Sequence, residues 1–401
     1  MPEAVIVATG RTPIGRAVKG SLKDCRPDDL AALVIKEVLA KLPRLDPQTV
    51  EDVLLGCGQP GGEAGYNVGR VAALMAGLPN VPGVTVNRYC SSSLQTIRMA
   101  AHAIRSGEGD IFVAAGVEAV SSYRNGASDT GPHNPLFAEA EARTVARTPK
   151  AGDPWTPLDG LPDVYIAMGQ TAENVAEFKK VSRQEQDEFA LQSQLRAVAS
   201  QESGFFDREI IPVTTPDGTV VTKDDGPRPG TTLEGLAGLQ PVFREGGTVT
   251  AGNACPLNDG AAAVIVMSDT KARELGITPL ARIVASGVTG LNPEIMGLGP
   301  IDAIRQTLKR ANMTIDDIDL VEINEAFAAQ VVPSARELGI SYDKLNVHGG
   351  AIALGHPFGQ TGARIMTTLL NGLEDADKTF GLESMCVGGG QGMAMIVERL
   401  S

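Results

Sequence analysis

Two cysteines of the sequence stand where a thiol could become reactive. Cys386 is followed closely by Gly388, Gly389 and Gly390, and glycines let a ligand approach the main chain and leave N–H groups free to face it. Cys90 is expected to begin a helix, where the helix dipole and unpaired N–H groups favour the thiolate and lower the pKa of the thiol. Cys90 is therefore placed like a nucleophile. The alternative is a small buried residue packed under the helix.

A histidine that could take a proton from such a thiol lies in the stretch GGAIALGHPFGQTGAR. His356 stands on a restricted turn between Gly355 and Pro357, before a helix that is expected to open near Thr361. An imidazole there suits a general base for a thiol. The alternative is a structural or surface histidine, and His348 is expected to be structural.

The stretch VEINEAFAAQ supplies an amide and a carboxylate. A strand ending near Ile323 would deliver Asn324 and Glu325 to the carboxyl edge of a sheet, where ligands of α/β folds bind. The amide could orient a water or a histidine, and the carboxylate could fix the tautomer of a histidine. The alternative is that Asn324 caps the helix that follows.

Two thiols, an imidazole, an amide and free backbone N–H groups together make a coherent set for thioester chemistry.

Two glycine-rich stretches do not qualify as nucleotide- or phosphate-binding motifs. GCGQPG at 56–61 follows a strand, but a proline delays the helix and no acidic residue ends a strand about 20 positions later, as dinucleotide binding requires. The three glycines at 388–390 are no phosphate loop, because no Lys-Ser or Lys-Thr follows them.

Composition narrows the class of protein. A net charge of −13 argues against nucleic acid or an anionic membrane as the main partner. The five cysteines are odd in number, far apart and without C-x-x-C spacing, which predicts neither a disulfide framework nor a metal site. No apolar run reaches about 18 residues and no charged-then-apolar leader opens the chain. We expect a cytoplasmic protein that does not span a membrane.

The elements that must hold these residues alternate between strands and helices. Strand-like runs such as AVIVATG and DIFVAAG alternate with helical segments in the first 120 residues, which predicts an α/β fold with a buried, largely parallel sheet. The nucleophile helix would run from about Cys90 to Gly107, with Leu94, Ile97, Ala101 and Ile104 on one face.

The second half of the chain repeats the first. ARIVASGVT at 281, DDIDLVEINEAFA at 316 and MCVGGGQGMAMIVER at 385 echo segments at 4, 48 and 254 in the same order, which suggests a duplicated unit. Chance similarity of such strands is the alternative. Residues 121–245 change character: a Gly- and Pro-rich stretch is predicted as loop, followed by helices with a capping box at Ser182 and Glu185. We expect this insertion to cover a site.

The sequence resembles the thiolase family of acyl-CoA acyltransferases over nearly its whole length. The matching stretches are RTPIGR, NRYCSSSLQTI, MGQTAENVA, TAGNACPLNDGAAAV, NEAFA, GGAIALGHPFGQTGAR and CVGGGQG. The resemblance implies a five-layered αβαβα fold from two similar halves, residues 1–120 with 246–275 and residues 276–401. Residues 121–245 would form the substrate-covering loop domain. It further implies a homo-oligomer, either a dimer or a tetramer.

The resemblance also implies the roles of the site residues. Cys90 would attack the acyl thioester with help from His356 and form an acyl-enzyme. Cys386 would deprotonate the α-carbon of a second acyl-CoA. The N–H groups of Cys90 and Gly388 look like one oxyanion hole, and His356 with a water held by Asn324 looks like the other.

Coenzyme A enters as substrate and product, and the resemblance implies neither a tightly bound cofactor nor a metal. The family's pantetheine tunnel would be lined here by five residues: Met168, Ala254, Met296, Ala326 and Phe327. Arg228 is similar to a family residue near the nucleotide, and Cys255 lies near the expected pantetheine contact.

Three departures from the family stand out. Many relatives have glycine in place of Ser93, Ser-Gly in place of Cys255-Pro256, and asparagine in place of His348.

As the activity of this chain, acetyl-CoA acetyltransferase is favoured slightly over a longer-chain 3-ketoacyl-CoA thiolase. The rivals are a decarboxylating ketoacyl synthase, which would pair its cysteine with two histidines or a histidine and an asparagine, and a non-catalytic acyl-CoA or lipid-binding protein, which would lack a catalytic group.

Overall fold

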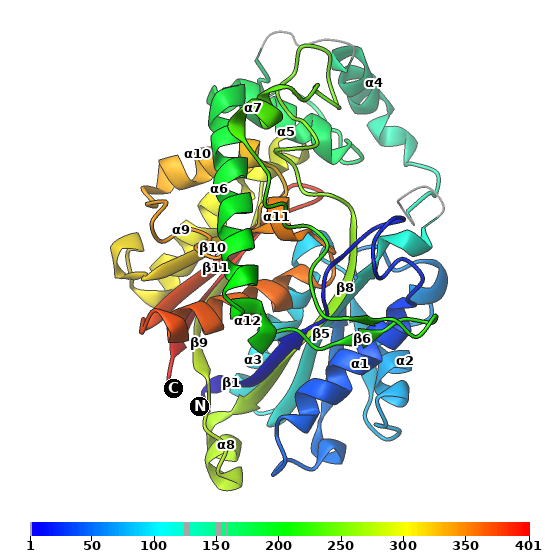
Figure 1. Ribbon diagram of the computed structural model, residues 1–401, viewed down its shortest axis with the longest axis vertical. Coiled ribbons are helices and arrows are strands. Elements are labelled where there is room, and N and C mark those ends of the chain that lie inside the picture. The colour runs from blue at the N-terminus through cyan, green and yellow to red at the C-terminus, as the bar shows by residue number, and fades with distance from the viewer. Residues whose placement is uncertain (1, 124–128, 149–153, 158) are drawn as a thin grey trace.

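The computed structural model describes residues 2–123, 129–148, 154–157 and 159–401. Two α/β halves lie side by side, and the intervening segment covers the top and runs down one side as the long helix α6 (Figure 1). The parts of the predicted loop at 124–128, 149–153 and 158 lie outside the described residues.

The elements of the first half are β1 (Ala4–Arg11), β2 (Gly15–Arg16), α1 (Pro27–Ala40), β3 (Asp52–Gly56), α2 (Val68–Met75), β4 (Gly83–Val86), α3 (Ser92–Ser106), β5 (Ile111–Ala119), β8 (Asn258–Ser268) and α8 (Asp269–Leu275). Those of the second half are β9 (Ala281–Gly290), α9 (Gly299–Ala311), β10 (Leu320–Ile323), α10 (Ala328–Leu338), α11 (Ala351–Leu354), α12 (Thr361–Asp375), β11 (Phe380–Val387) and β12 (Gln391–Arg399). The insertion carries α4 (Ala138–Arg147), α5 (Met168–Lys179), α6 (Arg183–Glu202), β6 (Val213–Thr214), β7 (Val220–Val221) and α7 (Leu233–Ala237).

The strands follow one path in the order β10-β11-β12-β9-β1-β8-β5-β3-β4. The path is narrow at the centre, where β1 and β9 pair through only Val5 with Arg282 and Ile6 with Ala281. Counted outward from this junction, β9 corresponds to β1, β12 to β8 and β10 to β3. These are the three pairs of segments that the sequence repeat matched.

The expectation of a largely parallel sheet was wrong. Among the strands of the described residues, only the β3–β4, β3–β5 and β10–β11 pairs are parallel, whereas β1, β8, β9 and β12 all run antiparallel to their neighbours. The continuous apolar runs that suggested parallel pairing arise because helices cover both faces of each half-sheet, so that every residue of β5 and β8 is buried.

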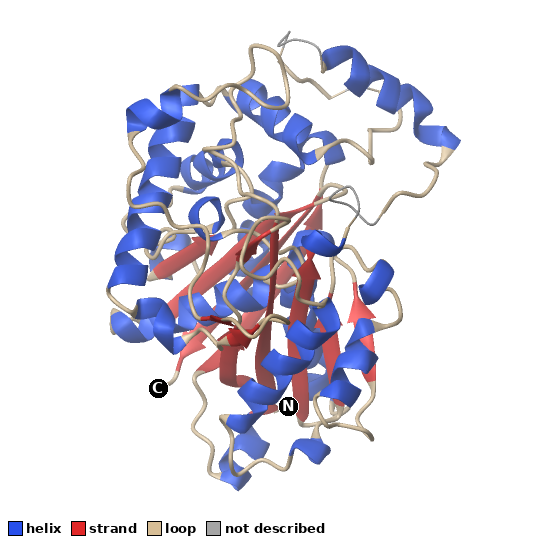
Figure 2. Ribbon diagram, turned by 45° about the vertical axis from the view of Figure 1, so that its right-hand side comes forward, coloured by secondary structure: helices blue, strands red, loops and turns tan. Residues whose placement is uncertain are grey.

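Helices and sheets form layers (Figure 2) that are held together by three apolar cores, and the central core contains residues of both half-sheets. Helices α1 and α2 cover the outer face of the first half-sheet, with Val34 in that core. Helices α3 and α12 lie between the two half-sheets, where Ile97 and Ile365 pack together. Helices α9 and α10 cover the outer face of the second half-sheet, with Val331 in the third core. The fold is therefore the expected αβαβα arrangement.

Local predictions for the helices are mostly confirmed. Helix α3 ends at Gly107 with φ of 81°, a left-handed conformation that glycine adopts without strain. Helix α6 begins with the predicted capping box of Ser182 and Glu185. Helix α4 was missed within the predicted loop, because its apolar residues are alanines and one valine, of which only Ala140 is buried, and the stretch around it is rich in Gly and Pro.

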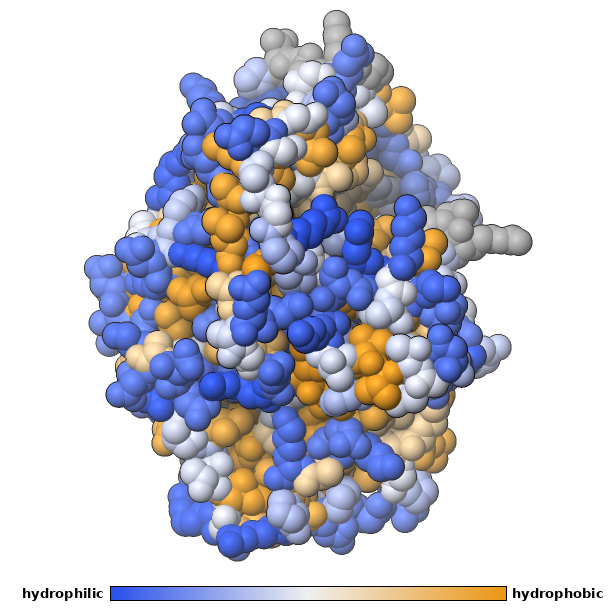
Figure 3. Space-filling model, in the orientation of Figure 1, coloured by the Kyte–Doolittle hydropathy of each residue, from blue (hydrophilic) through white to orange (hydrophobic). Residues whose placement is uncertain are grey.

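The described residues include no helix long and apolar enough to cross a membrane. The face drawn in Figure 3 mixes charged and polar side chains with small apolar patches.

Candidate active site

Cys90 lies on a tight turn between strand β4 and helix α3. The turn is the single 3-10 turn Tyr89–Ser91, and Tyr89 has a φ of 43°, which is uncommon for a residue with a side chain. Cys90 is 8% exposed and opens onto a cavity of about 280 Å³. This cavity is lined by Gln59, Tyr89, Cys90, Asp129, His133, Val164, Tyr165, Ile166, Met168, Phe358, Gly388 and Gly389. A small core residue packed under a helix would have no such opening.

The pKa of Cys90 is raised to about 11, because burial penalises the thiolate more than its surroundings stabilise it. The expectation of a lowered pKa is therefore wrong for the free protein. The backbone N–H groups of Gly388 and Cys90 do favour the thiolate, as predicted for a helix start, but the desolvation cost is larger. These are also the two N–H groups that the sequence suggested as an oxyanion hole.

The glycine run at 388–390 forms the turn between strands β11 and β12, in which Val387 pairs with Gln391. Gly389 and Gly390 have φ of 75° and 81°, and a Cβ on Gly390 would lie 2.2 Å from the carbonyl oxygen of Leu291. The turn thus needs glycine at these positions. It presents the N–H of Gly388 to Cys90 just after the strand that carries Cys386.

His356 is 1% exposed, which excludes a surface role. Its backbone N–H donates to Oδ1 of Asn258 at 2.9 Å, and its ring nitrogen Nδ1 lies 2.6 Å from Oγ1 of Thr361. Burial, with a smaller contribution from the charge of Arg364, lowers the pKa of His356 to about 3. The imidazole is therefore neutral at pH 7.

Asn324 faces the imidazole and does not cap a helix. Helix α10 begins at Ala328 with Phe327 as its N-cap, whereas Nδ2 of Asn324 lies 3.3 Å from Nε2 of His356. Oδ1 of Asn324 is buried and has no hydrogen-bond partner among the described residues, so a bound water or substrate atom would satisfy it.

The carboxylate of Glu325 does not reach the histidine, contrary to expectation. It accepts hydrogen bonds from the side chains of Ser193 and Asn346 and from the backbone N–H of Ile352. Glu325 therefore ties the insertion helix α6 to the segment that leads into the His356 turn. The ring partner of the histidine is Thr361 instead.

Cys386 is 1% exposed and lies in an apolar cluster. Its S–H donates to Oε1 of Gln330 at 3.2 Å, a contact that the sequence analysis missed although Gln330 ends the quoted VEINEAFAAQ stretch. Burial raises the pKa of Cys386 well above its ordinary value, and the neighbouring thiols of Cys90 and Cys255 raise it further. The two predicted reactive sulfurs are thus in one neighbourhood.

The starts of helices α3 and α12 pack directly against each other. Oγ of Ser93 accepts the backbone N–H of Ala363 at 2.9 Å, and a Cβ on Gly362 would lie 2.3 Å from the backbone nitrogen of Leu94. This contact brings the turn of Cys90 beside the turn of His356. Within the described ranges no hydrogen bond joins the Cys90 thiol to the His356 ring, and such contacts often tighten only when substrate binds.

The G-x-G-x-x-G stretch at 56–61 forms a wall of the same site. The N–H groups of Gly58 and Gln59 both donate to the buried carboxylate of Glu118, at 2.8 and 3.1 Å, and the N–H of Gly359 donates to it at 2.8 Å. These N–H groups are committed to a carboxylate, which argues against a phosphate-binding loop.

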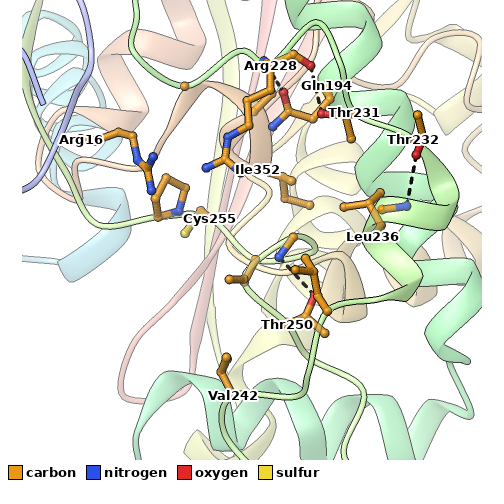
Figure 4. A pocket seen from close by; sticks show the side chains of 18 of the residues that line it. Arg16, Gln194, Arg228, Thr231, Thr232, Leu236, Val242, Thr250, Cys255 and Ile352 are labelled. Atoms are coloured by element: carbon orange, nitrogen blue, oxygen red, sulfur yellow. Dashed lines mark hydrogen bonds between the residues drawn. The ribbon is translucent and has the colours of Figure 1, made fainter. Parts of the chain in front are cut away.

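A groove of about 570 Å³ lies between the insertion and the core (Figure 4). Arg16 and Arg228 reach into it from two sides toward Cys255. Of the residues predicted to contact coenzyme A, Arg228, Ala254 and Cys255 line this groove. Arg16 was not singled out, although it ends the quoted RTPIGR stretch.

The other predicted contacts lie deeper. Met168 lines the Cys90 cavity, while Met296, Ala326 and Phe327 surround Cys386 in the apolar cluster. The backbone N–H of Cys255 donates to the carbonyl oxygen of Ala326 at 3.0 Å, and Ala254 and Cys255 belong to the same cluster. The wall of the groove is therefore continuous with the cluster around Cys386.

Comparison with known proteins fits this geometry. The family model "Thiolase, N-terminal domain" matches residues 4–270, and "Thiolase, C-terminal domain" matches residues 277–399. The chain belongs to the thiolase family. This thiolase is 45% identical to the beta-ketoadipyl-CoA thiolase of Acinetobacter baylyi and 44% identical to the 3-ketoacyl-CoA thiolase of Vibrio vulnificus, with all of both chains covered in each case.

A solved structure has the same fold as this thiolase. The crystal structure of the Bacillus anthracis acetyl-CoA acetyltransferase matches this thiolase with a TM-score of 0.85 and 42% sequence identity. The match covers 100% of this chain and 99% of the other. The thiolase family uses acyl-CoA and CoA as substrates, so the chain is an acyl-CoA acyltransferase by family.

Proposed function

We propose that this thiolase carries its acyl group on Cys90 and moves the α-proton of the second substrate with Cys386. One observation carries the proposal: a single hairpin holds Cys386 on its strand and aims the Gly388 N–H of its turn at the Cys90 thiol. Substrate carbon bound to Cys90 would therefore lie beside both an oxyanion donor and the second sulfur.

In the first half-reaction, the proton of the Cys90 thiol moves to Nε2 of His356 while the sulfur bonds to the thioester carbonyl carbon. The bond from that carbon to the CoA sulfur breaks, and the departing thiolate takes the proton of Cys386. The products are free CoA, acyl-Cys90, a protonated His356 and a Cys386 thiolate.

In the second half-reaction, the Cys386 thiolate removes an α-proton from acetyl-CoA, and the resulting enolate carbon attacks the acyl carbon. The bond to the Cys90 sulfur breaks, and that sulfur takes back the proton held by His356. All groups return to their starting states. Thiolysis is the same sequence in reverse, and covalent storage of the acyl group gives ping-pong kinetics.

Hydrogen-bond donors would stabilise the two oxyanions. The N–H groups of Cys90 and Gly388 would meet the oxygen of the Cys90 thioester. Protonated His356 and a water held by Asn324 would meet the enolate oxygen. Removing one such donor typically costs about 10²- to 10³-fold in rate.

For the substrate, we propose a 3-ketoacyl-CoA whose acyl group is longer than acetyl. The sequence placed acetyl-CoA acetyltransferase slightly ahead, but the cavity of about 280 Å³ beside Cys90 exceeds what an acetyl group needs. Apolar walls at Val164, Ile166 and Met168 would contact the chain.

The groove that holds Arg16 and Arg228 is the proposed entry for coenzyme A. It brings two cations to the surface of a chain whose net charge is −13, and phosphate groups favour such a site. Coenzyme A would act as substrate and product, with no tightly bound cofactor.

We also propose that the protein assembles as a homodimer or tetramer. Strand β4 ends the sheet path and is half-buried, and Tyr66, Leu74 and Met75, in and just before the neighbouring helix α2, are exposed. Light scattering coupled to size exclusion tests this assembly.

The test of the proposed function is thiolysis of 3-ketoacyl-CoA substrates of increasing chain length. We expect turnover beyond the four-carbon substrate, with no acyl-enzyme in Cys90→Ala. Cys386→Ala is expected to form acyl-enzyme, because CoA thiolate leaves without assistance, but to lose condensation. Full condensation by Cys386→Ala would show that another group is the base, and activity confined to acetoacetyl-CoA would refute the longer-chain substrate.

A further inference from the structure

The side chain of Thr361 makes two contacts that together fix a proton. Oγ1 of Thr361 lies 2.6 Å from Nδ1 of His356 and donates to the carbonyl oxygen of Pro357 at 2.8 Å. A hydroxyl has one proton and a carbonyl can only accept. Once that proton is used on Pro357, the short contact to the ring is a hydrogen bond only if Nδ1 carries the imidazole proton.

The amide of Asn324 does not select between the two ring nitrogens. Nδ2 of Asn324 lies 3.3 Å from Nε2 and 3.5 Å from Nδ1 of His356. A neutral imidazole has one proton, and the contact with Thr361 assigns it to Nδ1. Burial keeps the ring neutral at pH 7 by lowering the pKa of His356.

We propose that Thr361 is a positioning residue that holds His356 as the Nδ1–H tautomer and so leaves Nε2 free to take the proton of Cys90. The inference rests on the proposed function, in which Nε2 receives that proton and later returns it. The Nδ1–H···Oγ1 bond persists through both half-reactions, because Nδ1 never gives up its proton.

A hydroxyl partner has a consequence that a carboxylate would not have. A carboxylate at Nδ1 would stabilise the imidazolium in the resting state, whereas Thr361 is uncharged. The structure directs the nearby carboxylate of Glu325 to Ser193, Asn346 and Ile352 instead. His356 therefore becomes charged only when it takes the thiol proton.

The geometry of Thr361 is firmly held. Thr361 is fully buried as the first residue of helix α12, and its backbone N–H donates to the carbonyl oxygen of Pro357 at 3.0 Å. The side chain is thus fixed on the same short turn that carries His356.

Nitrogen NMR of the free protein labelled with ¹⁵N-histidine tests the assignment without any substrate. The chain has four histidines, and a His356→Asn variant identifies the signals of His356. At pH 7 we expect a protonated Nδ1 and an unprotonated Nε2. A protonated Nε2 in the wild-type protein would overturn the proposal, whatever the activity measurements show.

Kinetics of Thr361→Val and Thr361→Ser provide the second arm. Valine keeps the shape but removes the acceptor. We expect acyl-enzyme formation to slow by about 10- to 100-fold, with the KM for acyl-CoA nearly unchanged and the tautomer shifted toward Nε2–H. Serine should restore the wild-type tautomer and most of the rate. A Thr361→Val protein with the wild-type tautomer and rate would refute the role.

The two proposals fail in different ways. A wild-type protein that forms no acyl-enzyme on Cys90 would refute the proposed function, whereas the NMR signals of His356 report on the tautomer alone. If Thr361→Val does not fold, the wild-type spectrum still decides the assignment.

Discussion

Replacing Ser93 with alanine should weaken the joint between the two helices that carry the site. The hydroxyl of Ser93 accepts the N–H of Ala363, the third residue of helix α12, and both residues are fully buried. That N–H has no partner within its own helix, and the N-cap residue Gln360 offers no side-chain bond. Ser93 therefore supplies the missing cap from another helix.

The magnitude follows from the buried N–H. Leaving it unpaired costs about 1 to 3 kcal/mol. With an unfolding entropy of about 2 cal/mol/K per residue over 401 residues, Tm should fall by about 1 to 4 °C. Ser93→Gly should lose about 1 kcal/mol more, because position 93 lies in the first turn of α3. The kcat should also fall, since the loosened turn carries Thr361.

Thermal unfolding and amide hydrogen exchange at Ala363 measure these effects. The matched control is Ser106→Ala, an exposed serine at the far end of the same helix, which should change stability by less than about 0.5 kcal/mol. If Ser93→Ala is as stable as the control, the hydrogen bond does not tie the helices together. If Ser93→Gly is as stable as Ser93→Ala, position 93 does not carry the helix-propensity cost of glycine.

Three further outcomes are expected. Alkylation of Cys90 by iodoacetamide, followed by peptide mass spectrometry, should accelerate about tenfold per pH unit from pH 7 to 9. The reason is that the reactive thiolate is a minor fraction below the pKa of about 11, and this fraction rises about tenfold with each pH unit. A plateau below pH 8 would contradict the raised pKa. His348 stacks on Phe205 at 3.6 Å and burial lowers its pKa to about 4. The unfolded chain then binds a proton that the folded chain does not, so stability should fall by up to about 3 kcal/mol as the pH drops from 6.5 to 4. His348→Asn should lack this pH dependence, and an unchanged profile would refute it. Arg228→Ala should raise the KM for CoA about 2- to 5-fold and leave kcat unchanged, and the increase should be smaller at high salt because salt screens the charge of Arg228. A fall in kcat with an unchanged KM would show that Arg228 does not bind CoA.

Much of the fold could be predicted because it depends on local patterns. The apolar face of α3, the capping box of α6 and the repeated strand segments each encode their element within a short stretch. Strand direction could not be predicted in this way, since a strand covered by helices on both faces has the same apolar run whether its neighbours are parallel or antiparallel. Helix α4 was missed because its apolar residues are alanines and one valine within a stretch rich in Gly and Pro.

For the candidate site, the sequence predicts which residues take part but does not predict their pKa values or hydrogen-bond partners. The side chains of Cys90, His356, Asn324 and Cys386 could be chosen from the sequence, because each lies on a turn or near the end of a strand that the local pattern predicts. The pKa values and hydrogen-bond partners of these side chains could not be predicted from the sequence. The pKa of Cys90 depends on desolvation by residues far away in the sequence, and the partners of His356 and Glu325 depend on how loops pack. Thr361 and Gln330 were quoted in motifs but carried no signal that distinguished them from helix residues.

The middle layer of the fold is built from both halves of the duplication. Helix α3 comes from the first half and α12 from the second, and their shared core, together with the Ser93–Ala363 contact, exists only when the halves meet. If the chain were cut near residue 276 and the fragments were made separately, each would present a bare apolar helix to water. Neither fragment would contain a complete reaction centre, and mixing the fragments could restore turnover only through their mutual docking.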